Sequence, residues 1–134
     1  MTRWQGLPTR PLNPRECPFC QIHEGRAPAT VAHRWRGQTD VAIVPLNPVT
    51  AGHLLIVPVD HITDPADGHV VVGRSMGRAA WLAKREGYAS FNIILSYGAD
   101  ATQTVEHVHV HLIPRTVGDG LALPWDPKGE GADR

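Results

Sequence analysis

Residues 103–115 carry the strongest structural signal in the chain and read Gln103-Thr104-Val105-Glu106-His107-Val108-His109-Val110-His111-Leu112-Ile113-Pro114-Arg115. From His107 onward, polar and apolar residues alternate with a period of two. Successive side chains of a β-strand point to opposite faces, so a strand here places three imidazoles on one face and an apolar row on the other. We expect this strand over residues 108–113, with its apolar face on the core and its imidazole face on a site.

The spacing of the three histidines limits what they can do together. Alternate residues of a strand lie about 6.6 Å apart, so the outer two imidazoles are about 13 Å apart. A metal ion with bonds of about 2 Å reaches two neighbouring imidazoles but not all three. The residues alone leave three interpretations: a polar surface strand, a metal site that uses two histidines, or nucleophilic and acid–base chemistry.

The loop before the histidines favours the third interpretation. Residues 96–105 combine small residues, hydroxyls and one amide. Backbone N–H groups and short polar side chains of this kind can approach phosphate oxygens closely. A plain turn has a similar composition, so the signal depends on the histidines that follow it.

The rest of the chain predicts an α+β fold with an antiparallel sheet of about five strands and one main helix. Asp64-Pro65 is a typical helix start, and Gly87 a typical stop. Gly68, Gly73 and the valines between them are poor helix formers, so the helix over 65–86 is expected in one piece or two. A short helical turn is expected over 18–25, and the other strands over 31–35, 41–44, 53–57 and 91–96.

Composition narrows the class of protein. The 134 residues fit one domain, with 13 basic and 13 acidic side chains, so net charge predicts no nucleic-acid or membrane partner. The apolar runs are too short for a membrane span or a secretory signal, which predicts a cytoplasmic protein. We expect an irregular N-terminal arm over 1–16, a domain over 17–125 and a flexible tail over 126–134.

The two cysteines form the sequence Cys17-Pro18-Phe19-Cys20. In a cytoplasmic protein this spacing indicates a metal site or a redox motif more than a structural disulfide. No βαβ pattern surrounds the pair, which disfavours the redox interpretation. Free buried thiols are the remaining alternative.

Together these motifs resemble the histidine triad (HIT) family of nucleotide hydrolases and transferases. Residues 103–115 are similar to the family signature. The remaining similarities follow in the family's order and cover roughly residues 17–125: Cys17 to Cys20, Leu46-Asn47-Pro48, Gly52-His53, Val57-Pro58, Gly118 to Leu121, and Pro124-Trp125. The resemblance implies a HIT-like fold with a short zinc-bound segment near the N-terminus.

The resemblance also assigns roles to residues. It implies that His109 attacks the α-phosphorus of a nucleotide and forms a covalent nucleotidyl-histidine, and that His111 lies near the phosphate. Gln103 and Thr104 match positions that contact the phosphate and the leaving group. The implied nucleotide-binding candidates also include Ile43, Leu46, Leu55 and Ser96, although the three apolar residues could equally be core residues.

A structural zinc and a homodimer are further implications. By resemblance the zinc ligands are Cys17, Cys20, His53 and His107, with His33 and His61 as less favoured substitutes. Some relatives use a C-terminal tryptophan, matched here by Trp125, to reach the active site of the partner subunit. The resemblance implies a homodimer whose sheet continues across both subunits.

Three positions depart from the family pattern. Pro45 stands where an acidic residue commonly binds the ribose, Ser96 where Asn or Gln commonly faces the phosphates, and Thr102 where glycine usually precedes the glutamine. The predicted function is hydrolysis at the α-phosphate of a nucleoside phosphoramidate or dinucleoside polyphosphate. The alternatives are a nucleotidyltransferase, a nucleotide-binding protein with little hydrolysis, and a zinc-stabilised interaction protein.

Overall fold

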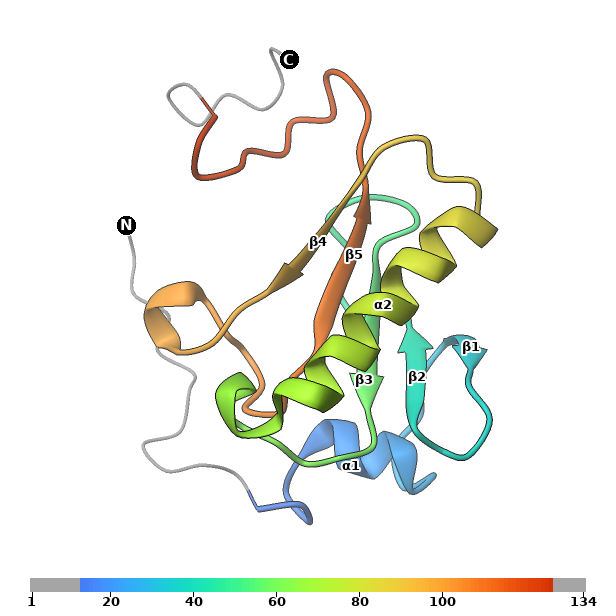
Figure 1. Ribbon diagram of the computed structural model, residues 1–134, viewed down its shortest axis with the longest axis vertical. Helices are drawn as coiled ribbons and strands as arrows, with labels where there is room; N and C mark the ends of the chain where they lie inside the picture. Colours follow the sequence, from blue (N-terminus) through green and yellow to red (C-terminus); the bar gives the residue numbers. More distant parts are fainter. Residues whose placement is uncertain (1–12, 127–134) are drawn as a thin grey trace.

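The computed structural model describes residues 13–126 (Figure 1). Most of the predicted arm and all but one residue of the predicted tail lie outside this range. Five strands form one antiparallel sheet in the order β1-β2-β3-β5-β4. The elements are α1 (Pro18–His23), β1 (Val31–Arg34), β2 (Asp40–Ile43), β3 (Leu54–Pro58), η1 (Pro65–Gly68), α2 (His69–Arg85), β4 (Phe91–Leu95), η2 (Ala99–Ala101) and β5 (Val110–Pro114). The predicted antiparallel α+β fold is therefore confirmed.

The long helical segment has two pieces, as its glycines allowed. The Asp64 side chain accepts a hydrogen bond from the backbone N–H of Ala66 and so caps η1. Gly68 then leaves helical geometry, and α2 begins at His69. At the far end Gly87 adopts a φ of +75°, and Tyr88 N–H donates to Ala83 O at 2.9 Å, which closes the last turn.

Helix α2 crosses one face of the sheet (Figure 1). Its weak helix formers are tolerated because Ala79, Leu82 and Ala83 are buried against the strands. The strand residues on this face are Ala42, Leu54, Ile56, Val110 and Leu112. Among the described residues, no helix combines the length and apolar character needed to cross a bilayer.

The opposite face of the sheet is covered at one end by α1 (Figure 1). Cys17, Phe19 and Cys20 pack there against the alternate strand residues Val41, Ile43, Leu55 and Val57. Leu55 is the register partner of His111, so the histidines belong to this face. The antiparallel pairing thus gives the sheet a mainly hydrocarbon face under α2, where Asp40 is the buried exception and accepts from Arg74 and Ser75. The other face, beside α1, bears the histidines.

Candidate active site and metal centre

The three histidines have separate environments, which agrees with the limit set by their spacing. The apolar row Val108, Val110 and Leu112 is buried as expected. The strand itself begins at Val110, two residues later than predicted, because Val108 N–H donates to Ile62 O at 2.7 Å instead of joining the ladder. His107 and His109 therefore lie at the entrance to β5 and His111 within it.

His109 is 5% exposed, and within residues 13–126 only one of its ring nitrogens, Nδ1, has a hydrogen-bond partner. Its Nδ1 lies 2.8 Å from the carbonyl oxygen of His107. A carbonyl only accepts, so Nδ1 carries the proton and Nε2 keeps its lone pair. Burial lowers the pKa of His109, which favours the neutral imidazole. A neutral imidazole with its lone pair on Nε2 has the chemistry of a nucleophile.

His111 is oriented by His53 through a chain of hydrogen bonds. Val49 N–H donates to His53 Nδ1 at 3.1 Å, which leaves the proton of the neutral ring on Nε2. His53 Nε2–H then donates to His111 Nδ1 at 3.0 Å, so the proton of His111 is on Nε2. Burial lowers the pKa of His111 to about 4, with smaller contributions from His109 and His53. His111 is thus a neutral donor whose ring centroid lies 5.2 Å from that of His109.

Gln103 presents a buried donor at the loop before the histidines. The residue is 3% exposed. Its side-chain Oε1 accepts from Gly98 N–H at 2.9 Å, and its backbone N–H donates to Gly98 O at 3.1 Å. Its Nε2 is buried and has no partner among residues 13–126. A buried amide without a partner is costly, so this group is poised for a ligand oxygen.

The neighbouring loop residues are more exposed. Thr102 adopts a left-handed backbone with φ of +63°, which a β-branched residue rarely takes. The threonine therefore keeps a backbone conformation that glycine would adopt freely. Thr104 is exposed, and Ser96 is half-buried directly after β4.

The apolar nucleotide-binding candidates have different positions. Ile43 and Leu55 are buried on the same sheet face as His111, in a cluster that also contains Phe19. Leu46 is 98% exposed on the loop after β2. The arrangement brings Ile43 and Leu55 to the histidine face and leaves Leu46 at the surface.

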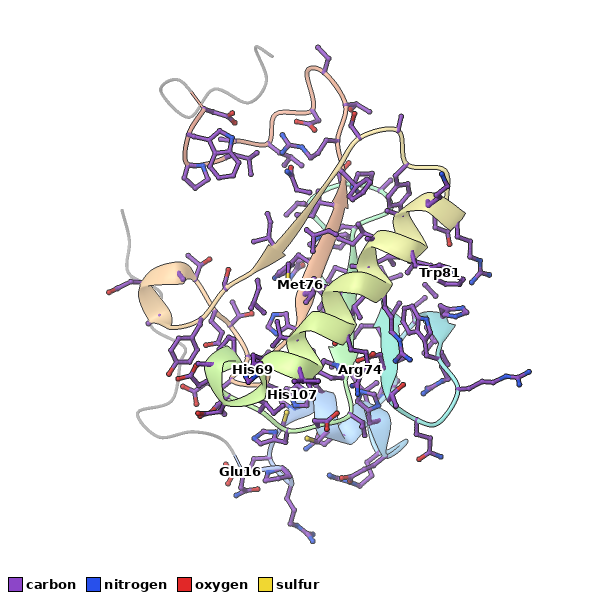
Figure 2. All side chains as sticks on the ribbon, in the orientation of Figure 1. Glu16, His69, Arg74, Met76, Trp81 and His107 are labelled. Atoms are coloured by element: carbon purple, nitrogen blue, oxygen red, sulfur yellow. The ribbon has the colours of Figure 1, made fainter. Side chains whose placement is uncertain are left out.

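A second centre lies where α1 meets the end of the sheet, around the His107 side chain (Figure 2). The ligand atoms of Cys17, Cys20, His61 and His107 all lie within 4.8 Å of one another. His107 Nε2 is 2.8 Å from Pro58 O and so carries the proton, which leaves Nδ1 facing the thiols. Burial lowers the pKa of His107 to about 4. A backbone acceptor on the far nitrogen is the arrangement that orients histidine ligands of metals.

The distances in this cluster match a tetrahedral zinc site. Zinc bonds of about 2.3 Å to sulfur and 2.0–2.1 Å to nitrogen require edges of about 3.3–3.8 Å between ligand atoms in a tetrahedron. His107 Nδ1 lies 3.4 Å from Cys17 Sγ, 3.6 Å from Cys20 Sγ and 3.2 Å from His61 Nδ1, and Cys20 Sγ lies 3.3 Å from His61 Nδ1. Burial raises the pKa of the Cys20 thiol to about 12, so its thiolate needs a nearby cation. The donor set is compatible with zinc.

The fourth member of this cluster corrects the sequence-based assignment. His61 occupies the place that was expected for His53, which lies instead against His111. The antiparallel register pairs Leu54 with Leu112 and Ile56 with Val110. Continued in both directions, it puts His107 beside the chain after β3, where His61 lies, and His53 at the opposite end of that strand.

Sequence reasoning also missed the role of Phe19. This residue lies between the two cysteines, and its ring contacts His107 and His109 edge-on, with centroid distances of 5.6 and 5.0 Å. The sequence signal for these contacts was the position of Phe19 between the two cysteines, next to the predicted metal ligands.

Comparisons with known proteins agree with this fold. A family model described as "HIT domain" matches residues 37–118. An uncharacterized HIT-like protein of Mycobacterium tuberculosis is 34% identical over 131 residues, covering 88% of each chain. The chain belongs to the HIT family.

Two further relatives bear on the chemistry. The adenosine 5′-monophosphoramidase of Schizosaccharomyces pombe is 29% identical over 114 residues, covering 81% of this chain and 82% of the relative. A crystal structure of a zinc-bound histidine triad family protein from Mycobacterium smegmatis is 32% identical, with a TM-score of 0.65 and coverage of 90% of this chain and 89% of that one.

Proposed function

We propose that the protein is a nucleotide hydrolase that acts on the α-phosphate of a nucleoside phosphoramidate or a dinucleoside polyphosphate. The observation that carries this proposal is the tautomer of His109, whose Nδ1–H is bound to a carbonyl while Nε2 keeps its lone pair. The activity of the S. pombe relative supports the same reaction class.

The proposed reaction has two steps. His109 Nε2 forms a bond to the α-phosphorus, and the bond from phosphorus to the leaving group breaks, so the leaving group departs with the bonding pair and takes up a proton from the solvent. Water then attacks the phosphorus of the nucleotidyl-histidine and gives a proton to the solvent, and the bond from phosphorus to Nε2 breaks, which releases the nucleoside monophosphate and restores the neutral imidazole. His111 Nε2–H and the buried Nε2 of Gln103 are the donors suited to stabilise the charge on the phosphoryl oxygens.

The nucleoside is proposed to lie on the histidine face, against Ile43 and Leu55. Thr104 and Ser96 are proposed as additional polar contacts beside the phosphates. Pro45 supplies no carboxylate for the sugar hydroxyls, so we expect weaker discrimination between ribose and deoxyribose than an acidic residue would give.

Zinc is proposed at Cys17, Cys20, His61 and His107. When bound, it would neutralise the thiolates and tie α1 to the end of β3 and the start of β5, a structural contribution. The zinc-bound relative from M. smegmatis supports this assignment.

A homodimer is proposed through β4. In the described sheet β4 is an edge strand, so its outer backbone groups are available to pair with a second copy. Trp125 is 72% exposed and is the candidate to reach the partner's site. Light scattering coupled to size-exclusion chromatography tests this assembly, and a stable monomer would contradict it.

The function is tested by comparing wild type with His109→Asn on adenosine phosphoramidate, guanosine phosphoramidate, diadenosine polyphosphates and their deoxy counterparts. His69→Asn, which changes an exposed histidine, is the matched control. We expect monophosphate release by wild type and the control and none by His109→Asn. Binding without release would favour the nucleotide-binding alternative, and release only with an added acceptor would favour a transferase.

A further inference from the structure

Phe19 connects the cluster of Cys17, Cys20, His61 and His107 to His109, the proposed nucleophile. The two cysteines that flank Pro18-Phe19, Cys17 and Cys20, are two of the four cluster residues, so the backbone on both sides of the ring leads to a cluster residue. The ring is 7% exposed and packs edge-on against His109 at 5.0 Å and 73°. The position of this ring therefore depends on how the two cysteines are held.

His107 makes the second connection. Its Nδ1 belongs to the cluster, and its Nε2–H is fixed by Pro58 O at 2.8 Å. The carbonyl of the same residue accepts the Nδ1–H of His109. Two contacts thus orient His109. The hydrogen bond comes from His107, which is itself a cluster residue, and the edge-on ring contact comes from Phe19, which lies between the two cysteines of the cluster.

We infer that the cluster and Phe19 form one device that positions the nucleophile, with Phe19 as a positioning residue. Cys17, Cys20 and His61 act on His109 without touching substrate, through the Phe19 ring and the His107 carbonyl. The kinetic part of this inference rests on the proposed function. Misplacing a nucleophile lowers turnover of bound substrate, because only the attack geometry changes.

Two simpler roles for Phe19 lead to different results. If the ring only fills the core, its removal lowers stability and leaves turnover of the folded protein unchanged. If the ring only forms a wall for the nucleoside, its removal raises KM and leaves kcat unchanged. Positioning predicts a loss in kcat with little change in KM.

The test uses Phe19→Leu, Cys20→Ser, the double variant, and Leu82→Ala as a control that removes buried volume on the α2 face. With adenosine phosphoramidate we expect Phe19→Leu to lower kcat about tenfold with KM within about twofold, and Leu82→Ala to change neither once folded. The double variant should lose little more than the more damaged single variant, because both changes act through one contact. Additive losses, or a loss in KM alone, would overturn the inference.

A second measurement needs no turnover and no cysteine variant. Nitrogen NMR of the substrate-free protein, at one mildly alkaline pH, reports which ring nitrogen of His109 carries the proton. We expect a single Nδ1–H tautomer in wild type and Leu82→Ala, and a mixture in Phe19→Leu. An unchanged His109 signature in Phe19→Leu would overturn the inference. If wild type releases no monophosphate, the proposed function fails while this measurement still decides the positioning role.

Discussion

The two faces of the sheet use the same strands for different purposes. Toward α2, the even-numbered residues of β3 and β5 are buried among the aliphatic side chains of the helix. Toward α1 lie His111 of β5 and His109 just before that strand, and the cover is supplied by the short helix α1 with Cys20 and its N-cap Cys17. One alternating sequence can therefore place the apolar side chains that stabilise the fold on one face and the reactive imidazoles on the other.

The faces also differ in how their polar groups are satisfied. On the α2 face the residues behind the histidines, Val110 and Leu112, make apolar contacts, and the buried Asp40 is satisfied separately by Arg74 and Ser75 of α2. On the α1 face each imidazole has a defined partner: Pro58 O for His107, His107 O for His109, and His53 for His111. Substitutions on the two faces should therefore have separable effects on turnover and on stability.

The largest expected effect is on the chemical face. His109→Asn should lower kcat by at least about a thousandfold, because it removes the attacking nitrogen. Steady-state kinetics measures this loss, and thermal unfolding of the same variant should show a fold that remains cooperative. Retention of more than a tenth of the wild-type kcat would place the nucleophile elsewhere.

The proposed zinc cluster of Cys17, Cys20, His61 and His107 should contribute the next largest effect, which we expect on the free energy of unfolding. We expect His61→Asn to lose bound zinc and His53→Asn to retain it, which separates the observed cluster from the one predicted from sequence. Loss of a tightly bound ion should lower the free energy of unfolding by about 4 kcal/mol or more. Elemental analysis and chemical denaturation measure the two quantities. Stoichiometric zinc in His61→Asn, with none in His53→Asn, would restore the original ligand set.

On the hydrocarbon face, Leu112→Ala should lower the free energy of unfolding by about 2–5 kcal/mol, because Leu112 is fully buried beneath α2. The adjacent residue His111 places its imidazole on the other face, yet kcat should stay within about twofold of wild type while the variant is folded. Denaturant unfolding and kinetics at low temperature check both statements. A large fall in kcat in the fully folded variant would show that the faces are coupled.

The smallest effect is expected at the loop. Thr102→Gly should raise the free energy of unfolding by up to about 1 kcal/mol, since glycine relieves the left-handed strain but loosens the unfolded chain. Thr104→Gly is the matched control, because it also adds a glycine to this loop but at a position whose φ is not positive, so no backbone strain is relieved. Destabilisation of Thr102→Gly to the same extent as Thr104→Gly would show that the threonine is not strained.

Much of this architecture follows from local sequence patterns. The alternation in residues 107–112 predicts the buried row and the division of the histidines, and Asp64-Pro65 and Gly87 mark the ends of the helical segment. These features depend on a few adjacent residues. Glycine and consecutive valines are poor helix formers, so the sequence leaves one helix or two over 65–86, and the structure places the break after Gly68.

The fourth cluster residue could not be assigned in the same way. His53 and His61 flank the same strand, and either could approach a cysteine pair on α1. The choice depends on the register of β3 against β5 and on the end of the sheet that α1 covers, which are long-range properties. The contacts of Phe19 also require α1 to be placed in three dimensions.

The most direct test of the central claim is to trap the nucleotidyl-histidine. Wild type and His109→Asn are mixed with adenosine phosphoramidate, quenched during turnover and analysed by intact-protein and peptide mass spectrometry under conditions that preserve the bond between phosphorus and nitrogen. We predict an adenylyl group on His109 in wild type and none in the variant. Turnover with no adduct, or an adduct on a different residue, would contradict the assignment of His109 as the nucleophile.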